Sequence, residues 1–355
     1  MSRKTTQPRT RNPTYLGKHT AASWLAESNR YNDIPFLKDN YGKLPPFMLL
    51  FGDRRRVIDA TRELRLRNAV RLDLASEEIF GLQGSGRVNL ALGIYSPSGQ
   101  EKRMPLLLVE CQMGGSPNQI ILRELWALVK KGQYALDEHT AIKSNGIKAV
   151  RCGTAGGILT FAEEKQHPLL DVGDVVVAKD NIGNMGAILQ SLGSINFFKP
   201  RVFSIYCRRM AELGFNQIIH DGKGNRYIVQ PESEEMVKQL VRASQAQGLQ
   251  TYVGRNFSKD SLYLEADETQ VMALRTDFGV FSTEMEQLLI NFEAARFLHE
   301  HGILVETGLI SAIVGIVPGG SFAPDPYKEK VGNTERGILV AGANALYESF
   351  LELNP

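Results

Sequence analysis

The sequence has few of the features that mark secreted, metal-binding or disulfide-stabilised proteins. Only three cysteines, Cys111, Cys152 and Cys207, occur in 355 residues, and no two of them form a CxxC pair. An odd number of widely spaced cysteines argues against a disulfide framework and against a structural zinc site, and it suits a reducing compartment. We therefore expect a cytoplasmic protein with no bound metal and no cofactor.

Long apolar runs and an excess of charge of one sign are also missing. No stretch reaches the roughly 20 apolar residues with which a helix crosses a bilayer. The 41 lysine and arginine residues nearly balance the 39 aspartate and glutamate residues. Proteins that bind nucleic acid usually carry a strongly basic domain or face. We expect neither a membrane nor a nucleic acid among the partners of this chain.

Residues 1–45 differ in composition from the rest of the chain. They are basic, contain no acidic residue before Glu27, and lead into the Pro45-Pro46 pair without the apolar stretch of a secretory signal. We expect an irregular N-terminal lead-in that forms a solvated arm or clasps a second subunit. One domain with insertions is then expected over residues 46–355.

The remaining residues alternate between strand and helix patterns. Residues 47–51 (FMLLF) predict a strand, Gly52-Asp53 predicts a tight turn, and the following VIDATREL predicts a helix. A hairpin is expected around SPSGQ from residues 89–95 and 105–111, and GGSP at 114–117 is expected to open a helix with its serine as the cap. Further expected elements are strands at 147–151, 172–178, from 251 and at 303–317, helices at 201–213, 284–301 and 334–353, and a hairpin at 221–225.

This order of elements predicts the fold class. Apolar strands that alternate with helices are typical of an α/β protein whose sheet is covered on both faces. We expect a single domain with a central mixed, largely parallel twisted sheet flanked by helices. Ligands of such folds bind at the carboxyl ends of the strands, which is where the glycine clusters of this sequence fall.

Two segments place arginine beside a glycine turn at the end of a predicted strand. The first is GDRRR, from Gly52 to Arg56, and the second is RCGTAGGI, which begins at Arg151 and contains Thr154. Arginine offers a planar fork of donors, glycine exposes backbone amides, and threonine adds a hydroxyl, which together suit a phosphate. Glycine turns after strands are common and a run of arginines is often a solvated face, so each segment alone is weak evidence.

A third segment, STEMEQ, lies at the start of a predicted helix. Its two carboxylates, Glu284 and Glu286, flank Met285. Carboxylates at a helix N-terminus stabilise the helix dipole, which is one sufficient explanation. In the other, Glu286 accepts hydrogen bonds from two neighbouring sugar hydroxyls while Met285 packs against the sugar. Both interpretations stay open at this point.

Taken in order, these segments resemble the nucleoside phosphorylases of the uridine phosphorylase and hexameric purine nucleoside phosphorylase type. FGDRRRV resembles the PGDPxRV segment of that family, CQMGGSPNQIILRE its STGxGGPSxxIxxEE segment, and RCGTAGGI its R(I/V)GTxGGI segment. DVGDVVVA resembles the VGDVVI strand, FSKDSLY resembles FSADLFY near the base, and STEMEQ resembles the (V/I)EMEx sugar clamp. The ordered set covers about residues 47–286.

The resemblance implies roles for individual residues. Arg56, Arg151 and Glu286 would be the catalytic residues, while Gly114 and Gly115 would let the backbone pass close to the site. The expected phosphate ligands are Gly52, Arg56, Arg151 and Thr154; the ribose ligands are Met285, Glu286 and the neighbouring Glu284; the residues near the base are Phe257, Ser258, Leu262 and Tyr263.

The implied reaction is phosphorolysis of a nucleoside to the free base and ribose 1-phosphate, with inorganic phosphate as the co-substrate. Uridine is favoured because GTAGGI and the N-terminal YLGK are more similar to the uridine branch. The family completes its site with residues from a neighbouring subunit, so the resemblance also implies a homodimer or a larger homo-oligomer.

Several positions depart from the pattern of the family. LEADE stands where the uridine enzymes carry glutamine and arginine, and Pro318-Gly319-Gly320 stands where the purine enzymes carry aspartate. Glu77 and Glu78 fall where the subunit-lent arginine is expected, and Tyr15 replaces a histidine. A purine nucleoside phosphorylase, a nucleosidase that uses water and a catalytically silent member therefore stay open. A nicotinamide-dependent oxidoreductase ranks last, because no GxGxxG precedes a helix and an acid.

Overall fold

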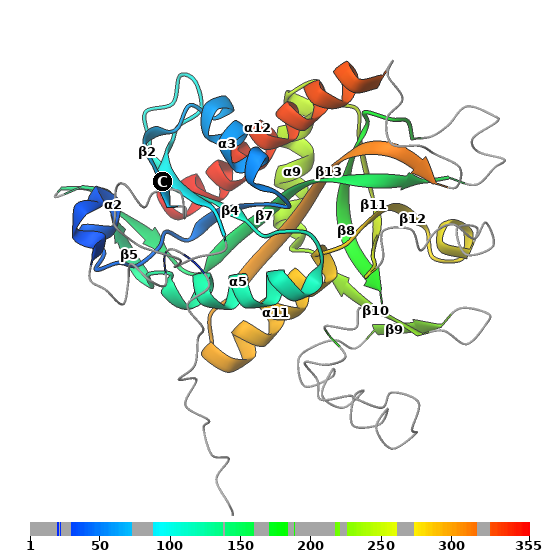
Figure 1. The fold of residues 1–355 in the computed structure, drawn as a ribbon, viewed down its shortest axis with the longest axis horizontal. Coiled ribbons are helices and arrows are strands. Elements are labelled where there is room, and N and C mark those ends of the chain that lie inside the picture. The colour runs from blue at the N-terminus through cyan, green and yellow to red at the C-terminus, as the bar shows by residue number, and fades with distance from the viewer. Residues whose placement is uncertain are drawn as a thin grey trace, which may run out of the picture.

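The computed structural model describes residues 20, 22, 30–72, 88–137, 139–159, 170–183, 188, 217–220, 226–260, 273–317 and 327–355. These residues form one central sheet with helices on both faces (Figure 1). The α/β class predicted from the sequence is confirmed. Within the described part of the chain, no helix is long and apolar enough to cross a membrane.

The first predicted unit, a strand followed by a tight turn and a helix, is also confirmed. β1 (Phe47–Phe51) is buried along its whole length, and α3 (Arg54–Glu63) begins after the turn. The carboxylate of Asp53 starts that helix by accepting a hydrogen bond from the Arg56 amide at 3.0 Å. β3 (Leu90–Tyr95) and β4 (Met104–Glu110) form the expected hairpin, and β4 lies parallel to β1.

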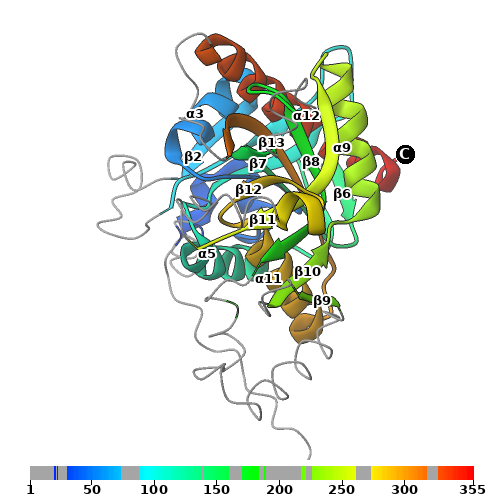
Figure 2. The ribbon, with the colours of Figure 1, turned by 90° about the vertical axis from the view of Figure 1, so that its right-hand side faces the viewer.

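Five strands of the sheet close into a small barrel. They are β7 (Ile147–Ile158), β8 (Val175–Gly183), β11 (Thr251–Ser258), β12 (Val280–Glu284) and β13 (Val305–Val317). The pairing runs from β7 to β12, β11, β8 and β13, and β13 returns to β7. Figure 2 shows these strands gathered around one another. The sheet is therefore partly closed rather than an open layer.

The rest of the sheet extends from this barrel in two directions. β1 continues from β7 toward β4, β3 and β2 (Arg67–Leu72), while β10 (Arg226–Pro231) and β9 (Gln217–His220) extend from β8. Among the described strands of this sheet, five pairings are parallel and six are antiparallel. The mixed sheet is confirmed, but the expected excess of parallel pairings is not found. Strand and helix alternation indicates crossovers and does not show which strands meet when a sheet closes.

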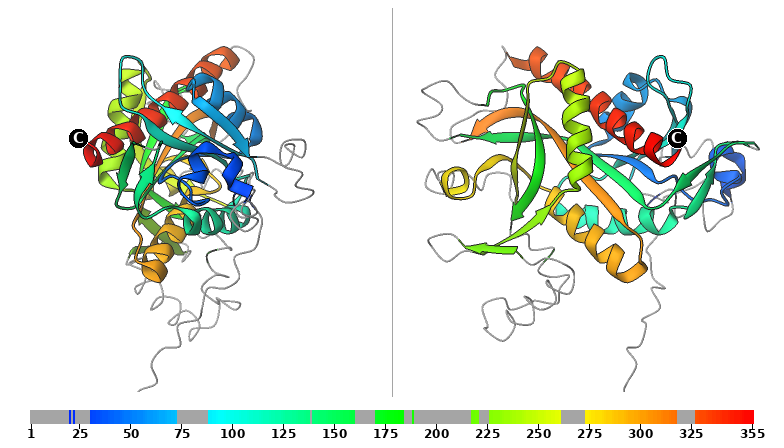
Figure 3. Two further views of the ribbon diagram at one scale, coloured as in Figure 1. Left: turned by 90° about the vertical axis from the view of Figure 1, so that its left-hand side faces the viewer. Right: turned by 180° about the vertical axis from the view of Figure 1, so that it is seen from behind.

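The helices form two layers, one on each face of the sheet (Figure 3). α3, α9 (Glu234–Ala246) and α12 (Lys328–Leu353) pack together on one face, and α5 (Gly115–Leu128) packs with α11 (Gln287–His301) on the other. These two layers bury both faces of the sheet, which explains why β1 and β3 are apolar at successive residues.

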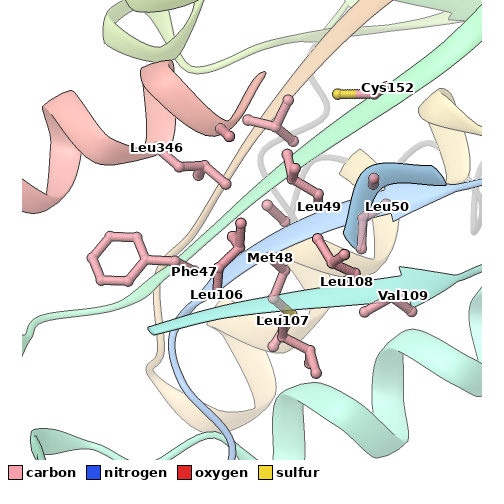
Figure 4. Packing of buried hydrophobic residues seen from close by; sticks show 14 of the residues in the cluster. Phe47, Met48, Leu49, Leu50, Leu106, Leu107, Leu108, Val109, Cys152 and Leu346 are labelled. Carbon is pink, nitrogen blue, oxygen red and sulfur yellow. The ribbon is translucent and has the colours of Figure 1, made fainter. Parts of the chain in front are cut away.

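Side chains alternate between these two layers along β1 and β7. Phe47 packs edge-to-face on Phe350 of α12, with ring centroids 5.8 Å apart, and Figure 4 shows Leu346 of the same helix over β1. Cys152 of β7 also faces α12, because its Sγ donates to the Ile338 carbonyl at 3.4 Å. The preceding residue, Arg151, therefore points toward the layer of α5 and α11.

Three boundaries differ from the predictions in ways that concern the candidate site. The glycine-rich residues after Arg151, expected as a turn, lie inside β7, which continues to Ile158 because β13 pairs with it throughout. The helix expected from Glu284 begins at Gln287, and Glu284 ends β12. α5 begins at Gly115, so Gly114 and not Ser116 is the residue before the helix.

Other elements lie outside the predicted set or outside the described residues. α9 and the hairpin of β5 (Gly132–Ala135) and β6 (Ala141–Ser144) were not predicted, and a short π-helical segment covers Ala273–Asp277. The helix expected at 201–213 and the turn expected at 221–225 lie outside the described residues, although β9 and β10 on either side of that turn are antiparallel.

Residues 30–45 join the same hydrophobic core. They contain a 3-10 turn (Arg30–Asp33) and α2 (Pro35–Lys38), and Ile34, Leu37 and Leu44 are buried with the residues of β1. The domain boundary at residue 46 stays a prediction.

Candidate functional site

The predicted phosphate residues meet at a gap in the sheet. On one edge of β7, β1 pairs as far as Arg151, and β12 pairs only at Gly156 and Gly157. Residues 152–155 lie between these contacts, and among the described strands they pair only with β13 on the opposite edge. Backbone amides and carbonyls need partners, so a gap of this kind is a natural place for a ligand.

Arg151 lies at this gap with only 4% of its surface exposed. Its Nη2 donates a hydrogen bond to Glu286 Oε2, and its Nε lies 3.7 Å from Glu284 Oε2. Nε and Nη1 have no hydrogen-bond partner within the described part of the chain. Because a buried donor without an acceptor is costly, these two nitrogen atoms mark a place for an anion.

Two glycines lie directly beside this guanidinium. A Cβ atom added at Gly52 would lie 3.8 Å from Arg151 Nη2, and one added at Gly153 would lie 3.7 Å from the same side chain. Gly52 directly follows β1, and Gly153 lies in the gap itself. The sequence therefore places two residues without side chains beside a buried cation, as the phosphate prediction requires.

The carboxylates of Glu284 and Glu286 stabilise the positive charge of Arg151. Burial alone would lower the pKa of its guanidinium, but Glu286 and Glu284 outweigh that effect and raise the pKa. Burial raises the pKa of Glu286, Arg151 lowers it and Glu284 raises it, and the net direction is upward. Arg151 is therefore firmly cationic, whereas the ionised form of Glu286 depends on that cation.

The two glutamates of STEMEQ have different partners. Glu284 Oε2 accepts hydrogen bonds from the amides of Glu286 and Gln287 at 2.7 and 2.9 Å, so Glu284 serves the N-terminus of α11. Glu286 instead faces Arg151, and its Oε1 accepts a hydrogen bond from the Gly114 amide at 2.8 Å. The dipole interpretation fits Glu284, while Glu286 lies where a ligand beside Arg151 would meet it.

Arg56 reaches β7 from the opposite face. Its Nη2 donates to Thr154 Oγ1 at 3.2 Å and to Glu335 Oε1 of α12 at 2.8 Å, and its Nε lies 3.5 Å from Asp53 Oδ2. The structure thus brings Arg56 and Thr154 together as predicted. Glu335 was missed, because it is 279 positions from Arg56 and no sequence pattern connects the two.

A cavity of about 440 Å³ opens beside Arg56, between α3 and α12. Its lining is mixed in charge and includes Cys152 at the strand. Neither Arg151 nor Glu286 lines it, so the cavity lies on the face of β7 that Arg56 contacts. The lining residues are Asp53, Arg55, Arg56, Asp59, Glu63, Cys152, Gly332, Glu335, Arg336, Ile338 and Leu339.

The residues expected near the sugar and the base are placed in part. Met285 is half-buried beside Glu286, and Ser258 donates a hydrogen bond to Glu284 Oε1. Phe257 is fully buried in an apolar cluster and packs on Tyr227 with ring centroids 6.1 Å apart. Leu262 and Tyr263 lie outside the described residues, and so do Tyr15, Glu77, Glu78 and 318–320. The base-binding roles stay predictions.

A chain of buried hydrogen bonds extends behind the carboxylates. Asn256 Nδ2 donates to Glu284 Oε1 at 2.8 Å and to Asn181 Oδ1 at 2.9 Å. Asn181 in turn donates to Glu232 at 2.5 Å, and Thr307 donates to the other oxygen of Glu232 at 2.8 Å. Burial raises the pKa of Glu232 to about 7, although hydrogen bonds from Asn291, Thr307, Asn181 and Gln287 oppose that rise.

Covalent catalysis by the described cysteines does not fit this site. Burial raises the pKa of Cys111 and of Cys152 to about 12, so both stay protonated thiols near neutral pH. In the described ranges of the chain, no cluster of three His, Cys, Asp or Glu side chains is arranged to hold a metal ion.

Comparison with known proteins adds one structural relationship. No family model matches the chain, and no curated protein matches it in sequence. A crystal structure of a Trypanosoma brucei nucleoside phosphorylase that shows uridine phosphorylase activity is similar over 84% of this chain and 93% of that chain, with a TM-score of 0.55 and 15% sequence identity. The chain therefore shares the fold of a nucleoside phosphorylase, and at this identity the likeness concerns the fold alone.

Proposed function

We propose that this protein cleaves a nucleoside with inorganic phosphate, and that uridine is its favoured substrate. The observation that carries the proposal is the buried guanidinium of Arg151, whose Nε and Nη1 have no acceptor among the described residues while its Nη2 donates to Glu286. A phosphate ion would supply the missing acceptors. The ordered sequence segments and the shared fold support the same reaction class.

In this proposal phosphate binds at the gap in the sheet. Arg151 contacts it from one face, Arg56 and Thr154 contact it from the other, and the backbone amides near Gly52 and Gly153 complete the site. The phosphate dianion stabilises the positive charge that develops on the ribosyl carbon. It then bonds to that carbon while the base leaves with the electron pair and takes up a proton. Positioning and electrostatic stabilisation provide the catalysis.

Glu286 has the second role, binding the ribose. Its oxygens accept hydrogen bonds from Arg151 Nη2 and from the Gly114 amide. Because phosphate would bind the other two nitrogen atoms of Arg151, Glu286 keeps its contact with Nη2, and the remaining lone pairs of its two oxygens accept from the 2′ and 3′ hydroxyls. Arg151 therefore orients both the phosphate and the carboxylate that binds the sugar, and Met285 packs beside that carboxylate.

The test is base release from uridine and from inosine, each with and without inorganic phosphate. Phosphate-dependent release together with ribose 1-phosphate is expected, with uridine faster than inosine. Faster release from inosine would indicate a purine nucleoside phosphorylase. Release without phosphate would identify a nucleosidase, and no release from either nucleoside would indicate a catalytically silent protein.

The silent alternative has one observation in its favour. Both predicted phosphate arginines already carry carboxylate partners, Arg151 with Glu286 and Arg56 with Glu335. Ion pairs of this kind also occur for purely structural reasons. An R151K variant that binds inorganic phosphate as tightly as the wild type would show that the donor fork of Arg151 is not used by a ligand.

The proposal includes a homodimer or larger homo-oligomer, as the family resemblance implies, and a cytoplasmic location, as the few and widely spaced cysteines suggest. Light scattering of the purified protein measures its mass directly, and a monomeric mass at micromolar concentration would contradict this part. The base-release assay is independent of that result.

A further inference from the structure

One charged contact at the candidate site has no role in the proposed reaction. Glu335 of α12 accepts a hydrogen bond from Arg56 Nη2 at 2.8 Å, while the same nitrogen donates to Thr154 at 3.2 Å. A carboxylate oxygen and a phosphate oxygen accept from a guanidinium with the same geometry. Glu335 thus takes the acceptor position that an anion on Arg56 would take.

We infer that Glu335 competes with phosphate for Arg56 and thereby sets the affinity of the protein for phosphate. The inference rests on the proposed function, because it assumes that Arg56 and Thr154 contact the ion. Arg56 remains held without Glu335, since Asp53 lies 3.5 Å from its Nε. Asp53 also starts α3, so Glu335 is the acid that can be removed without disturbing a helix terminus.

The fold gives Glu335 space to leave Arg56. Its side chain is 38% exposed and lines the cavity between α3 and α12. Gly332 lies three residues earlier on the same helix face and lines the same cavity. A Cβ atom added at Gly332 would meet no atom within 4 Å. The carboxylate can therefore turn into open space when an anion replaces it.

The first test compares E335Q with the wild-type protein in titrations with inorganic phosphate, followed by calorimetry and by the phosphate KM for uridine cleavage. Loss of the competing charge is expected to tighten phosphate binding about 2- to 5-fold, the range of a partly exposed ion pair, with the uridine KM unchanged. E329Q is the matched control, because Glu329 is exposed on the same helix and does not line the cavity. Unchanged or weaker phosphate binding by E335Q would overturn the inference.

The second test fills the space that Glu335 needs. G332F is expected to weaken phosphate binding about fivefold, the order of one partly exposed charge contact, and G332A is expected to bind phosphate as the wild type does. The two variants share the loss of a helical glycine, so a difference between them measures the volume of the side chain. Equal phosphate affinity of G332F and G332A would contradict the proposed movement of Glu335.

These outcomes also separate the inference from the proposed function. Phosphate-dependent uridine cleavage with no tightening in E335Q refutes the inference alone. Tighter phosphate binding in E335Q without nucleoside cleavage by any variant supports the inference and refutes the function. Absence of phosphate binding in both the wild type and E335Q refutes both.

Discussion

Arg151 and Arg56 are predicted to bind the same phosphate, yet they lie on opposite faces of β7 in different surroundings. Arg151 is 4% exposed, faces the layer of α5 and α11, and contacts Glu284 and Glu286 close to the start of α11. The Arg56 side chain is 22% exposed, lines a cavity, and contacts carboxylates of α3 and α12.

The ion pairs of the two arginines differ in how much they contribute to the stability of the fold. Removing one partner of a buried pair leaves an uncompensated charge in a low-dielectric interior, and this costs several kcal/mol, about 3 to 5. A partly exposed pair is worth about 1 kcal/mol or less, because water replaces the lost contact. We therefore expect Arg151 to contribute to stability as well as to phosphate binding, and Arg56 to contribute mainly to phosphate binding.

The largest effect on stability is expected for R151M. This variant leaves Glu284 and Glu286 buried without their cation, and the free energy of unfolding should fall by about 3–5 kcal/mol in urea denaturation. Adding E286Q to R151M should recover part of the loss without restoring phosphate-dependent cleavage. A loss for R151M no larger than that for R56M would break the contrast between the two faces.

A second prediction concerns Glu232, which lies at the other end of the buried hydrogen-bond network that includes Glu284. The pKa of Glu232 is raised from 4.5 to about 7 in the folded protein. The stability from its protonated form is therefore fully present below pH 4.5 and is lost as the pH rises through 7. Relative to E232Q, the wild type should lose about 3 kcal/mol of unfolding free energy between pH 4.5 and pH 8. A difference that stays constant over this range would mean that water reaches Glu232.

A third prediction concerns R56M, which removes the more exposed of the two arginines. The free energy of unfolding should change by about 1 kcal/mol or less, because the pairs with Glu335 and Asp53 are partly exposed. Phosphate affinity should fall at least tenfold, since a charge-assisted contact contributes about 1.5–3 kcal/mol. R62M is the control, with an arginine removed from the last turn of the same helix. If R56M unfolds as easily as R151M, Arg56 is mainly structural.

G52A should have the smallest effect on stability and still reduce binding. Its new Cβ would lie at an ordinary contact distance, 3.8 Å, from Arg151 Nη2, so the unfolding free energy should stay within about 0.5 kcal/mol. The added methyl group occupies the space proposed for the anion, and phosphate affinity should fall severalfold. Calorimetry with inorganic phosphate measures this. Unchanged affinity would place the phosphate elsewhere.

The part of the candidate site that is proposed to bind phosphate was the more predictable one. Arg151, Thr154, Gly52 and Arg56 were found because strand-end glycines and arginines lie close together in sequence, and the structure brings them to one gap. The base half was less predictable. Phe257 was expected beside the base, and its side chain is packed in the core, since a single aromatic residue suits either place.

Local sequence patterns were enough to predict the strand of residues 47–51, the helix that follows it, the hairpin of β3 and β4, and the end of α11 at Gly302, whose φ of 65° suits glycine. Each of these elements depends on the spacing of apolar residues, on turn residues and on caps. Three other features became apparent only in the folded chain: β13 returns to β7 and closes the barrel, the glycine-rich segment stays extended, and Glu335 contacts Arg56. Those outcomes depend on pairings between distant segments, and a local pattern carries no information about its partner.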